Sequence, residues 1–181
     1  IAMGITGTDV SKEAADMILT DDNFASIVKA VEEGRTIYAN IRKVVGFLLS
    51  CNIGEILVIF IAMLFNLPVP LAATQLLAIN LITDAFPAFA LGMERAEMGV
   101  VDRPPRDPLE PIVNKSRALS VGLQSIALAL GALAAFLFAY NAQAPISAIF
   151  TAPDPAAVSE AMTCCFLTLV LGELLRAYSS R

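Results

Sequence analysis

The sequence predicts a mainly α-helical protein: a polytopic membrane bundle of four transmembrane helices, preceded by a small α/β segment and one long helix. Hydrophobic residues make up 57% of the 181 residues and charged residues only 16%, whereas ordinary soluble domains carry about 25% charged residues. Four apolar stretches are each long enough to cross a hydrocarbon layer of about 30 Å. The net charge of −5 argues against nucleic acid as a partner, because nucleic-acid binding requires a basic face.

Residues 1–22 form the predicted α/β segment. Ile1–Met3 and Met17–Leu19 are short apolar runs typical of strands, and Thr8 is an N-cap residue type for a short helix ending near Asp16. The segment is too short to bury a core alone. It also starts at Ile1 rather than at a methionine, so we expect it to be the end of a larger α/β domain.

Residues 23–43 are predicted to form an amphipathic helix that begins near Asp22 or Asn23. Apolar residues recur at helical spacing from Phe24 to Val45, and charged residues occupy the positions between them. Because no proline interrupts this run, the helix can continue directly into the first membrane span. A continuous rod of this kind is suited to relaying motion between a soluble domain and a bilayer, although a plain long helix is the alternative interpretation.

The predicted membrane domain covers residues 44–178, and its four spans lie at about 44–65, 71–91, 118–140 and 158–178. The turn at 66–70 and the loop at 141–157 contain no Lys or Arg. All twelve basic residues therefore lie on one side of the membrane, which the positive-inside rule makes cytoplasmic. We expect both chain ends and the loop 92–117 on this side. The basic residues are Lys12, Lys29, Arg35, Arg42, Lys43, Arg95, Arg103, Arg106, Lys115, Arg117, Arg176 and Arg181.

Three carboxylates lie inside the apolar spans: Glu55, Asp84 and Glu173. A charged side chain at the centre of a bilayer costs several kcal/mol, so such residues face a protein interior and have a partner. The chain has no His, and no Lys or Arg falls at comparable depth. The three acids must therefore bind protons or cations, or pair with residues of other segments.

Polar neighbours extend this acidic set. Asn52 lies three residues before Glu55, and Asn80, Thr83 and Asp84 follow an i, i+3, i+4 pattern, so each group shares one helix face. The short turn at 66–70 makes the first two spans antiparallel neighbours. We expect their two oxygen-rich faces to meet. Packing by interhelical hydrogen bonds is the alternative for Asn52 and Thr83.

Pro87 adds a possible backbone ligand, because it has no N–H for the carbonyl of Thr83 and its ring crowds that turn. We expect the helix to unwind there. Carboxylates, amides, a hydroxyl and free carbonyls are hard donors that suit Ca²⁺, which takes 6–8 oxygens; Na⁺, K⁺ and Mg²⁺ remain alternatives, and soft metals are disfavoured. Cys51, Cys164 and Cys165 lie in apolar runs and are interpreted as reduced packing residues.

Together these segments resemble type II P-type ATPases, and among them the calcium pumps of sarcoplasmic-reticulum type and their bacterial relatives. Residues 1–24 resemble the end of the phosphorylation (HAD-like) domain of that family, and Val31–Arg35 resembles its stalk. Asn52–Glu55 and Asn80–Asp84 resemble the ion-binding segments of its fifth and sixth membrane helices, and Asp102–Arg106 the cytoplasmic loop that follows.

The resemblance implies an ATP-driven Ca²⁺ translocase in which residues 1–22 end the phosphorylation domain, 23–43 form the stalk and 44–178 form part of the membrane domain. One departure is Ala85, where many members have Gly. The phosphorylated Asp, its DKTG motif and the ATP site are absent from these residues. The resemblance therefore implies no catalytic residue here. The implied calcium ligands are Asn52, Glu55, Asn80, Thr83, Asp84 and Glu173.

It further implies that Mg²⁺ and ATP bind elsewhere in the parent chain, whose other domains and helices are partners of this segment, together with the lipid bilayer. Two alternatives stay open. One is a Na⁺, K⁺ or Mg²⁺ pump on the same frame. The other is a non-catalytic four-helix membrane scaffold.

Overall fold

The computed structural model describes residues 1–95, 99–100, 102, 104 and 111–180, and the chain divides into two compact units. One unit comprises Ile1–Asn40 and Glu94–Pro108, and the other comprises Ile41–Met93 and Leu109–Arg181. Most of the predicted loop motif Asp102–Arg106 lies outside the described residues, as do three of the basic residues used for the orientation argument, namely Arg103, Arg106 and Arg181.

The first unit begins with the expected strand–helix–strand segment. Strand β1 (Ala2–Met3) pairs in parallel with β2 (Ile18–Leu19), and helix α1 (Asp9–Glu13) connects them. Thr8 is the N-cap of α1, because its hydroxyl accepts a hydrogen bond from the backbone N–H of Ser11 at 3.3 Å. The helix ends earlier than the sequence predicted, at Glu13 rather than near Asp16.

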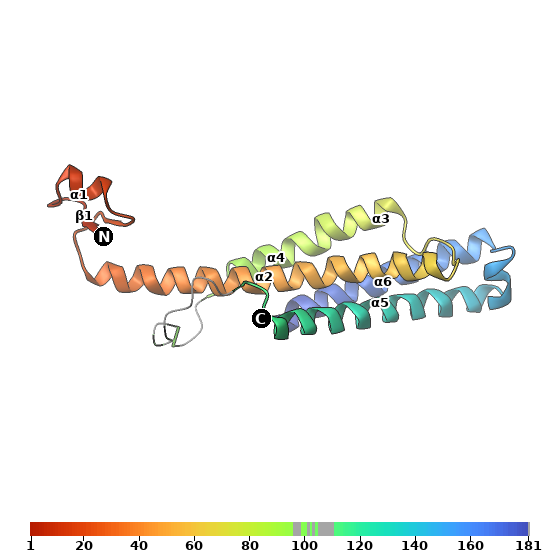
Figure 1. The fold of residues 1–181 in the computed structure, drawn as a ribbon. Helices are drawn as coiled ribbons and strands as arrows, with labels where there is room; N and C mark the ends of the chain where they lie inside the picture. The colour runs from red at the N-terminus through yellow and green to blue at the C-terminus, as the bar shows by residue number, and fades with distance from the viewer. Residues whose placement is uncertain (96–98, 101, 103, 105–110, 181) are drawn as a thin grey trace. The chain divides into compact units, whose positions relative to one another are not determined.

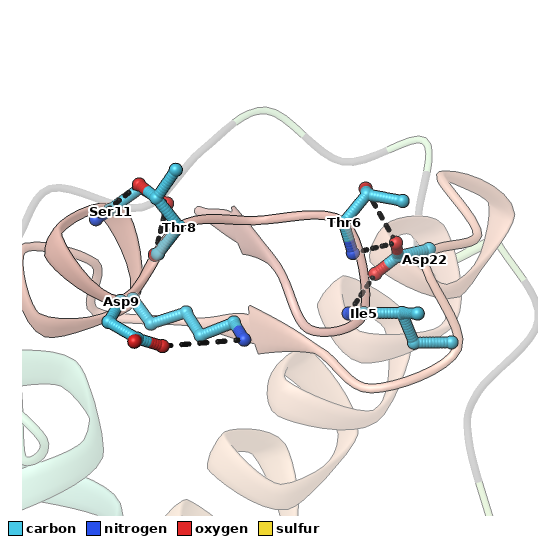
Figure 2. Close-up of polar contacts among 7 residues, drawn as sticks. Ile5, Thr6, Thr8, Asp9, Ser11 and Asp22 are labelled. Carbon is cyan, nitrogen blue, oxygen red and sulfur yellow. Dashed lines mark hydrogen bonds and ion pairs between the residues drawn. The ribbon is translucent and has the colours of Figure 1, made fainter.

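Asp22 closes this segment, with a backbone φ of 50° that few side chains other than Asp and Asn tolerate. Figure 2 shows its carboxylate accepting hydrogen bonds from the N–H groups of Ile5 and Thr6, both at 2.8 Å, and from the Thr6 hydroxyl at 2.7 Å. These donors favour the charged carboxylate, so the N–H of Ile5 and the hydroxyl of Thr6 hold the pKa of Asp22 below its ordinary value.

Helix α2 (Ala25–Leu64) is one continuous helix of 40 residues, as Figure 1 shows. Asn23 caps its first turn, because the side-chain oxygen accepts from the N–H of Ala25 at 3.0 Å. Its C-terminus is closed by Asn66, which has a φ of 52°, and by the N–H of Leu67, which donates to the carbonyl of Ala62 at 2.9 Å. This is the Schellman arrangement, which turns the chain sharply after a helix.

The remaining spans follow in order. The second consists of α3 (Ala73–Ala78), the π-helical segment η1 (Ile79–Asp84) and α4 (Ala85–Gly92). Helix α5 (Lys115–Gln143), the short 3₁₀ helix η2 (Ile146–Phe150) and α6 (Pro155–Ser179) complete the chain. The described residues thus include four helical stretches long and apolar enough to cross a membrane, which confirms the predicted membrane helical bundle.

Two clusters of buried apolar side chains hold the second unit together, and α5 and α6 lie side by side in it (Figure 1). The larger cluster includes Tyr140 and Phe136 of α5, both fully buried. Its other members are Val58, Ala62, Leu71, Ile79, Ala129, Ala132, Leu133, Ile149, Ala157, Ala161, Cys165 and Leu169. The smaller cluster consists of Phe47, Cys51 and Leu91, with Val44, Leu48, Ala88 and Ala177 packed against them.

Small residues bring three helices close together beside the acids. Leu128 of α5 fills the space over Gly54 of α2, where an added Cβ would lie 3.0 Å from its Cδ2, and over Gly172 of α6, where an added Cβ would overlap its Cδ1. Glycine removes the side chain that would otherwise hold these backbones apart. Because Gly54 precedes Glu55 and Gly172 precedes Glu173, this packing positions two of the three membrane acids.

Candidate cation site

The three membrane acids form a layer between the two apolar clusters. On each of three membrane spans, one carboxylate lies along the sequence between a residue of the larger cluster and a residue that belongs to the smaller cluster or packs against it. The flanking pairs are Cys51 and Val58 around Glu55, Ile79 and Leu91 around Asp84, and Leu169 and Ala177 around Glu173. Apolar side chains on both sides of the layer lower the local dielectric constant, so each charge in the layer interacts strongly with any ion beside it.

All three acids are buried. Glu55 is 5% exposed, Asp84 is 2% exposed and Glu173 is fully buried, although its position near the end of the span allowed a solvated side chain. Among the described residues, neither carboxylate oxygen of Asp84 or of Glu173 has a hydrogen-bond partner, and the same holds for Oε1 of Glu55. Buried polar atoms in native proteins are almost always paired, so five unpaired oxygens in one layer call for a ligand.

Glu55 and Asn80 connect the first two spans. The side-chain amide of Asn80 donates to Oε2 of Glu55 at 2.9 Å and to the carbonyl of Leu76 at 3.0 Å. The predicted meeting of the two polar faces is therefore present at these two residues. The bond orients Glu55 and leaves its second oxygen available.

Asp84 and Glu173 meet on the other side of the layer, together with a residue that the sequence analysis treated as packing. One carboxylate oxygen of each acid and the Sγ atom of Cys51 all lie within 4.8 Å of one another. The three residues come from η1, α6 and α2. The signal in the sequence was the spacing of Cys51, which lies four residues before Glu55 and so shares its helix face.

The pair Glu55 and Asn80 lies next to the group of Cys51, Asp84 and Glu173 along the helices. Cys51 and Glu55 lie about one turn apart on α2, and Asn80 and Asp84 are separated by the same interval on the second span. The three buried carboxylates lie in one layer, where like charges repel one another strongly because the local dielectric is low. A set of like charges so placed is stable only with protons or cations among them.

Asn52 and Thr83 take part less directly. The amide of Asn52 is half-buried and donates to the carbonyl of Leu48, one turn back on its own helix, at 2.9 Å. Thr83 is half-buried beside Asp84. In the described part of the chain, no hydrogen bond joins either side chain to Glu55, Asp84 or Glu173. Of the six predicted residues, four therefore form the two groups above, and Asn52 and Thr83 lie beside them.

The backbone at Asp84 is irregular, as expected, but it does not unwind. Residues Ile79–Asp84 form a π-helix, and Pro87 follows three residues later. Proline lacks the N–H that an α-helix would direct at the carbonyl of Thr83, and a wider turn is one way to accommodate that loss. Such π-helical turns are frequent at functional sites.

Arg176 lies one turn beyond Glu173, but its hydrogen bonds go to serines. Its Nε donates to the hydroxyl of Ser50 at 3.2 Å, and its Nη1 donates to that of Ser180 at 2.9 Å. Ser125 of α5 donates to the carbonyl of Ser50 at 2.8 Å. Within the residues that the structure covers, no Lys or Arg forms an ion pair with a membrane acid.

A four-span membrane bundle with unneutralised acids at its centre belongs to the class of ion-transporting membrane proteins. Residues 68–181 match the family model described as "Cation transporting ATPase, C-terminus", and the chain belongs to this family. It is an integral membrane protein, the C-terminal membrane region of a cation-transporting ATPase, as the sequence resemblance predicted.

Sequence similarity to curated proteins supports this assignment. The chain is 42% identical over 181 residues to a calcium-transporting ATPase of Bacillus subtilis, which covers all of this chain and 19% of that protein. It is 42% identical over 185 residues to calcium-transporting ATPase 1 of Bacillus cereus, covering 100% of this chain and 21% of that protein. It is 46% identical over 138 residues to a sodium/potassium-transporting ATPase subunit alpha of Drosophila melanogaster, or 76% of this chain and 13% of that protein. The chain therefore spans about a fifth or less of each relative.

Proposed function

We propose that these residues supply the ion-binding membrane helices of an ATP-driven Ca²⁺ pump. Glu55, Asp84 and Glu173 are the charged ligands of the cargo ion, and Asn80 is a neutral ligand bonded to Glu55. Asn52 and Thr83 complete the oxygen set after side-chain rotation. Carboxylates and amides in this number suit Ca²⁺, which takes 6–8 oxygen ligands at 2.3–2.6 Å.

One observation supports the proposal above the others. Three buried carboxylates from three spans lie in one layer, and five of their six oxygens have no partner among the described residues. Removing a carboxylate from water costs several kcal/mol unless a positive charge or a hydrogen bond compensates. A divalent cation offsets two of the three negative charges, and a proton or a second cation offsets the third.

We infer the remaining roles from family membership and from the sequence pattern. Residues 1–22 end the phosphorylation domain, 23–43 form the stalk that relays its motion, and 44–178 carry the ions across the membrane. ATP and Mg²⁺ bind to other parts of the full-length protein. The chain ends and the loop 92–117 face the cytoplasm, in accordance with the distribution of Lys and Arg.

A Na⁺ or K⁺ pump is the second candidate. It is favoured by the 46% identity over 138 residues to a sodium/potassium-transporting ATPase subunit. Phosphorylation of the full-length protein by ATP separates the two candidates. We expect micromolar Ca²⁺ to support it, and support by Na⁺ or by K⁺ alone would favour the alternative.

Uptake of ⁴⁵Ca²⁺ into vesicles by the full-length protein tests the site. We expect Glu55→Gln and Asp84→Asn to reduce uptake at least roughly tenfold, because a bond to a charged group contributes about 1.5–3 kcal/mol. The matched control is Glu160→Gln, which changes an exposed acid on α6. Uptake unchanged by both membrane substitutions would remove the site assignment.

A further inference from the structure

We propose that Cys51 is a third ligand beside Asp84 and Glu173, so that this part of the site binds soft divalent cations such as Cd²⁺ and Zn²⁺. The inference rests on the proposed cation site at these two acids, but not on Ca²⁺ being the cargo. It revises the expectation of an all-oxygen site, in which soft metals are disfavoured and Cys51 only packs.

The separations permit one shared ion. The Sγ atom of Cys51 and one oxygen each of Asp84 and Glu173 lie within 4.8 Å of one another. Zinc binds thiolate sulfur at about 2.3 Å and carboxylate oxygen at about 2.0–2.2 Å, so two ligand atoms of one tetrahedral ion are separated by no more than about 3.6 Å. Rotation of the three side chains, which must approach one another by about 1 Å, brings the atoms within that limit.

The donors are buried and available. Cys51 is a free cysteine and fully buried, Asp84 is 2% exposed and Glu173 is fully buried. Within the described chain, both oxygens of each acid lack a hydrogen-bond partner. A metal ion that enters this layer therefore displaces no protein hydrogen bond from the two acids.

The thiol changes which ion the site prefers. Carboxylate and carbonyl oxygens suit Ca²⁺ and Mg²⁺, whereas a thiolate selects softer ions. Coordination replaces the proton of the Cys51 thiol with the metal ion, and the proton leaves to solvent. The resulting set of one sulfur and two oxygens favours Zn²⁺ or Cd²⁺ more than a site lined by oxygen alone does.

The other cysteines provide a comparison within the same chain. Cys165 is also fully buried, but it belongs to the larger apolar cluster, and Cys164 beside it is half-buried. In the described residues, Cys51, Asp84 and Glu173 are the one set of three such side chains close enough to share an ion. Burial of a thiol alone thus does not make a site, and the two acids distinguish Cys51.

The test is a titration of the purified full-length protein with Cd²⁺, read by the ultraviolet charge-transfer absorption of a Cd–thiolate bond. The absorption spectrum of each cysteine variant is subtracted from that of the wild-type protein, which removes the contribution of thiols elsewhere in the chain. We expect the saturable absorption to be lost in Cys51→Ser and retained in Cys165→Ser. The absorption should also be lost in Asp84→Asn, because the acid holds the ion beside the sulfur.

A second variant and a second readout keep the result interpretable. Cys51→Ala is tested in parallel, with gel filtration to show that each variant is folded, and Cd²⁺ inhibition of ⁴⁵Ca²⁺ uptake is measured as a fraction of the uptake of each variant. We expect at least a tenfold higher inhibitory Cd²⁺ concentration in both Cys51 variants and an unchanged one in Cys165→Ser. Absorption and inhibition unaltered in folded Cys51 variants would overturn the inference while leaving the Ca²⁺ proposal intact. If the wild-type protein transports no Ca²⁺ but its Cd²⁺ absorption is still lost in Cys51→Ser, the soft-metal site stands and the Ca²⁺ proposal fails.

Discussion

Asp22 and Asp84 are the same side chain in opposite environments. Asp22 lies at the surface of the first unit, and its carboxylate accepts three hydrogen bonds from Ile5 and Thr6 (Figure 2). Asp84 is 2% exposed in the membrane bundle, and among the described residues its carboxylate accepts none.

The difference separates an acid that stabilises a turn from one that we propose as an ion ligand. A carboxylate that accepts its full set of hydrogen bonds stabilises the structure around it, as the carboxylate of Asp22 stabilises its turn. A buried carboxylate without them raises the free energy of the empty protein and lowers it when a cation binds. Burial and unmade hydrogen bonds together, rather than charge alone, are the basis on which we propose Asp84 as an ion ligand.

Replacement of Asp84 by Leu should have the largest effect on the response of thermal stability to Ca²⁺. It tests whether Asp84, unlike Asp22, destabilises the protein when no ion is bound. Removing an unpaired buried charge leaves the unfolding temperature of the Ca²⁺-free full-length protein unchanged or raises it. The rise on adding Ca²⁺ disappears, and this rise corresponds to about 2.7 kcal/mol at a ligand concentration 100 times the Kd. Thermal unfolding with and without Ca²⁺ measures both quantities. A lower unfolding temperature without Ca²⁺ would show that Asp84 stabilises the fold.

The glycines beside the acids give the next largest effect. In the double variant Gly54→Ala, Gly172→Ala, Leu128 is crowded from both sides, and overpacking of this kind costs about 1–3 kcal/mol. Adding Leu128→Ala should restore most of the lost stability, measured as the rate of thermal inactivation. Gly131→Ala is the control, because an added Cβ there meets no atom within 4 Å. Equal destabilisation by the control would remove the packing explanation.

Asn80→Ala should weaken ion binding moderately. It deletes the 2.9 Å hydrogen bond that orients Glu55, and a hydrogen bond contributes about 0.5–1.5 kcal/mol, or roughly 2- to 13-fold in affinity. The Ca²⁺ dependence of phosphorylation by ATP reports this change. Gln124→Ala, at an exposed amide on α5, should leave the dependence unaltered. An identical response of the two variants would contradict the role of Asn80.

Ser125→Ala should have a smaller effect, on stability alone. Its hydroxyl donates to the carbonyl of Ser50 on α2, and interhelical hydrogen bonds in membranes contribute about 0.6 kcal/mol. Ser120→Ala is matched, because that hydroxyl donates to Ser116 of its own helix. The unfolding temperature should fall slightly in the first variant and remain constant in the second. A larger fall in the control would reverse the interpretation.

The smallest effect concerns the pH response of the turn at Asp22. Its pKa lies below the ordinary value of 3.8, because the N–H of Ile5 and the hydroxyl of Thr6 stabilise the charged form. The carboxylate therefore stabilises the turn above its ordinary pKa, and this contribution is lost as the pH falls through the lowered pKa. Hydrogen–deuterium exchange at Ile5 and Thr6, corrected for intrinsic rates, should increase in that range. Asp22→Asn should show no such pH dependence; an identical pH profile in the variant would exclude the mechanism.

The sequence was sufficient to predict features that depend on one helix at a time. The four spans follow from apolar length, and the three acids are conspicuous because Glu55, Asp84 and Glu173 interrupt apolar runs. The cap at Thr8 and the helix irregularity before Pro87 follow from local chemistry. The π-helical form of that irregularity could not be predicted, because it depends on which backbone groups form the replacement hydrogen bonds.

Features made by several helices could not be predicted in this way. Cys51 has an apolar environment in its own span, and its proximity to Asp84 and Glu173 arises only when three helices pack. The same holds for Leu128, whose contacts with Gly54 and Gly172 depend on the crossing of α5 with two neighbours. Spacing along one helix identifies a face, but not which residues of other helices meet it.

Equilibrium binding of ⁴⁵Ca²⁺ to the full-length protein tests the central claim most directly, with Asp84→Asn and Asp22→Asn compared under the same conditions. The account predicts wild-type binding in Asp22→Asn and loss of bound Ca²⁺ in Asp84→Asn. Wild-type binding in folded Asp84→Asn would show that the unpaired buried acid is not a ligand, and the interpretation of the acidic layer as a cation site would be contradicted.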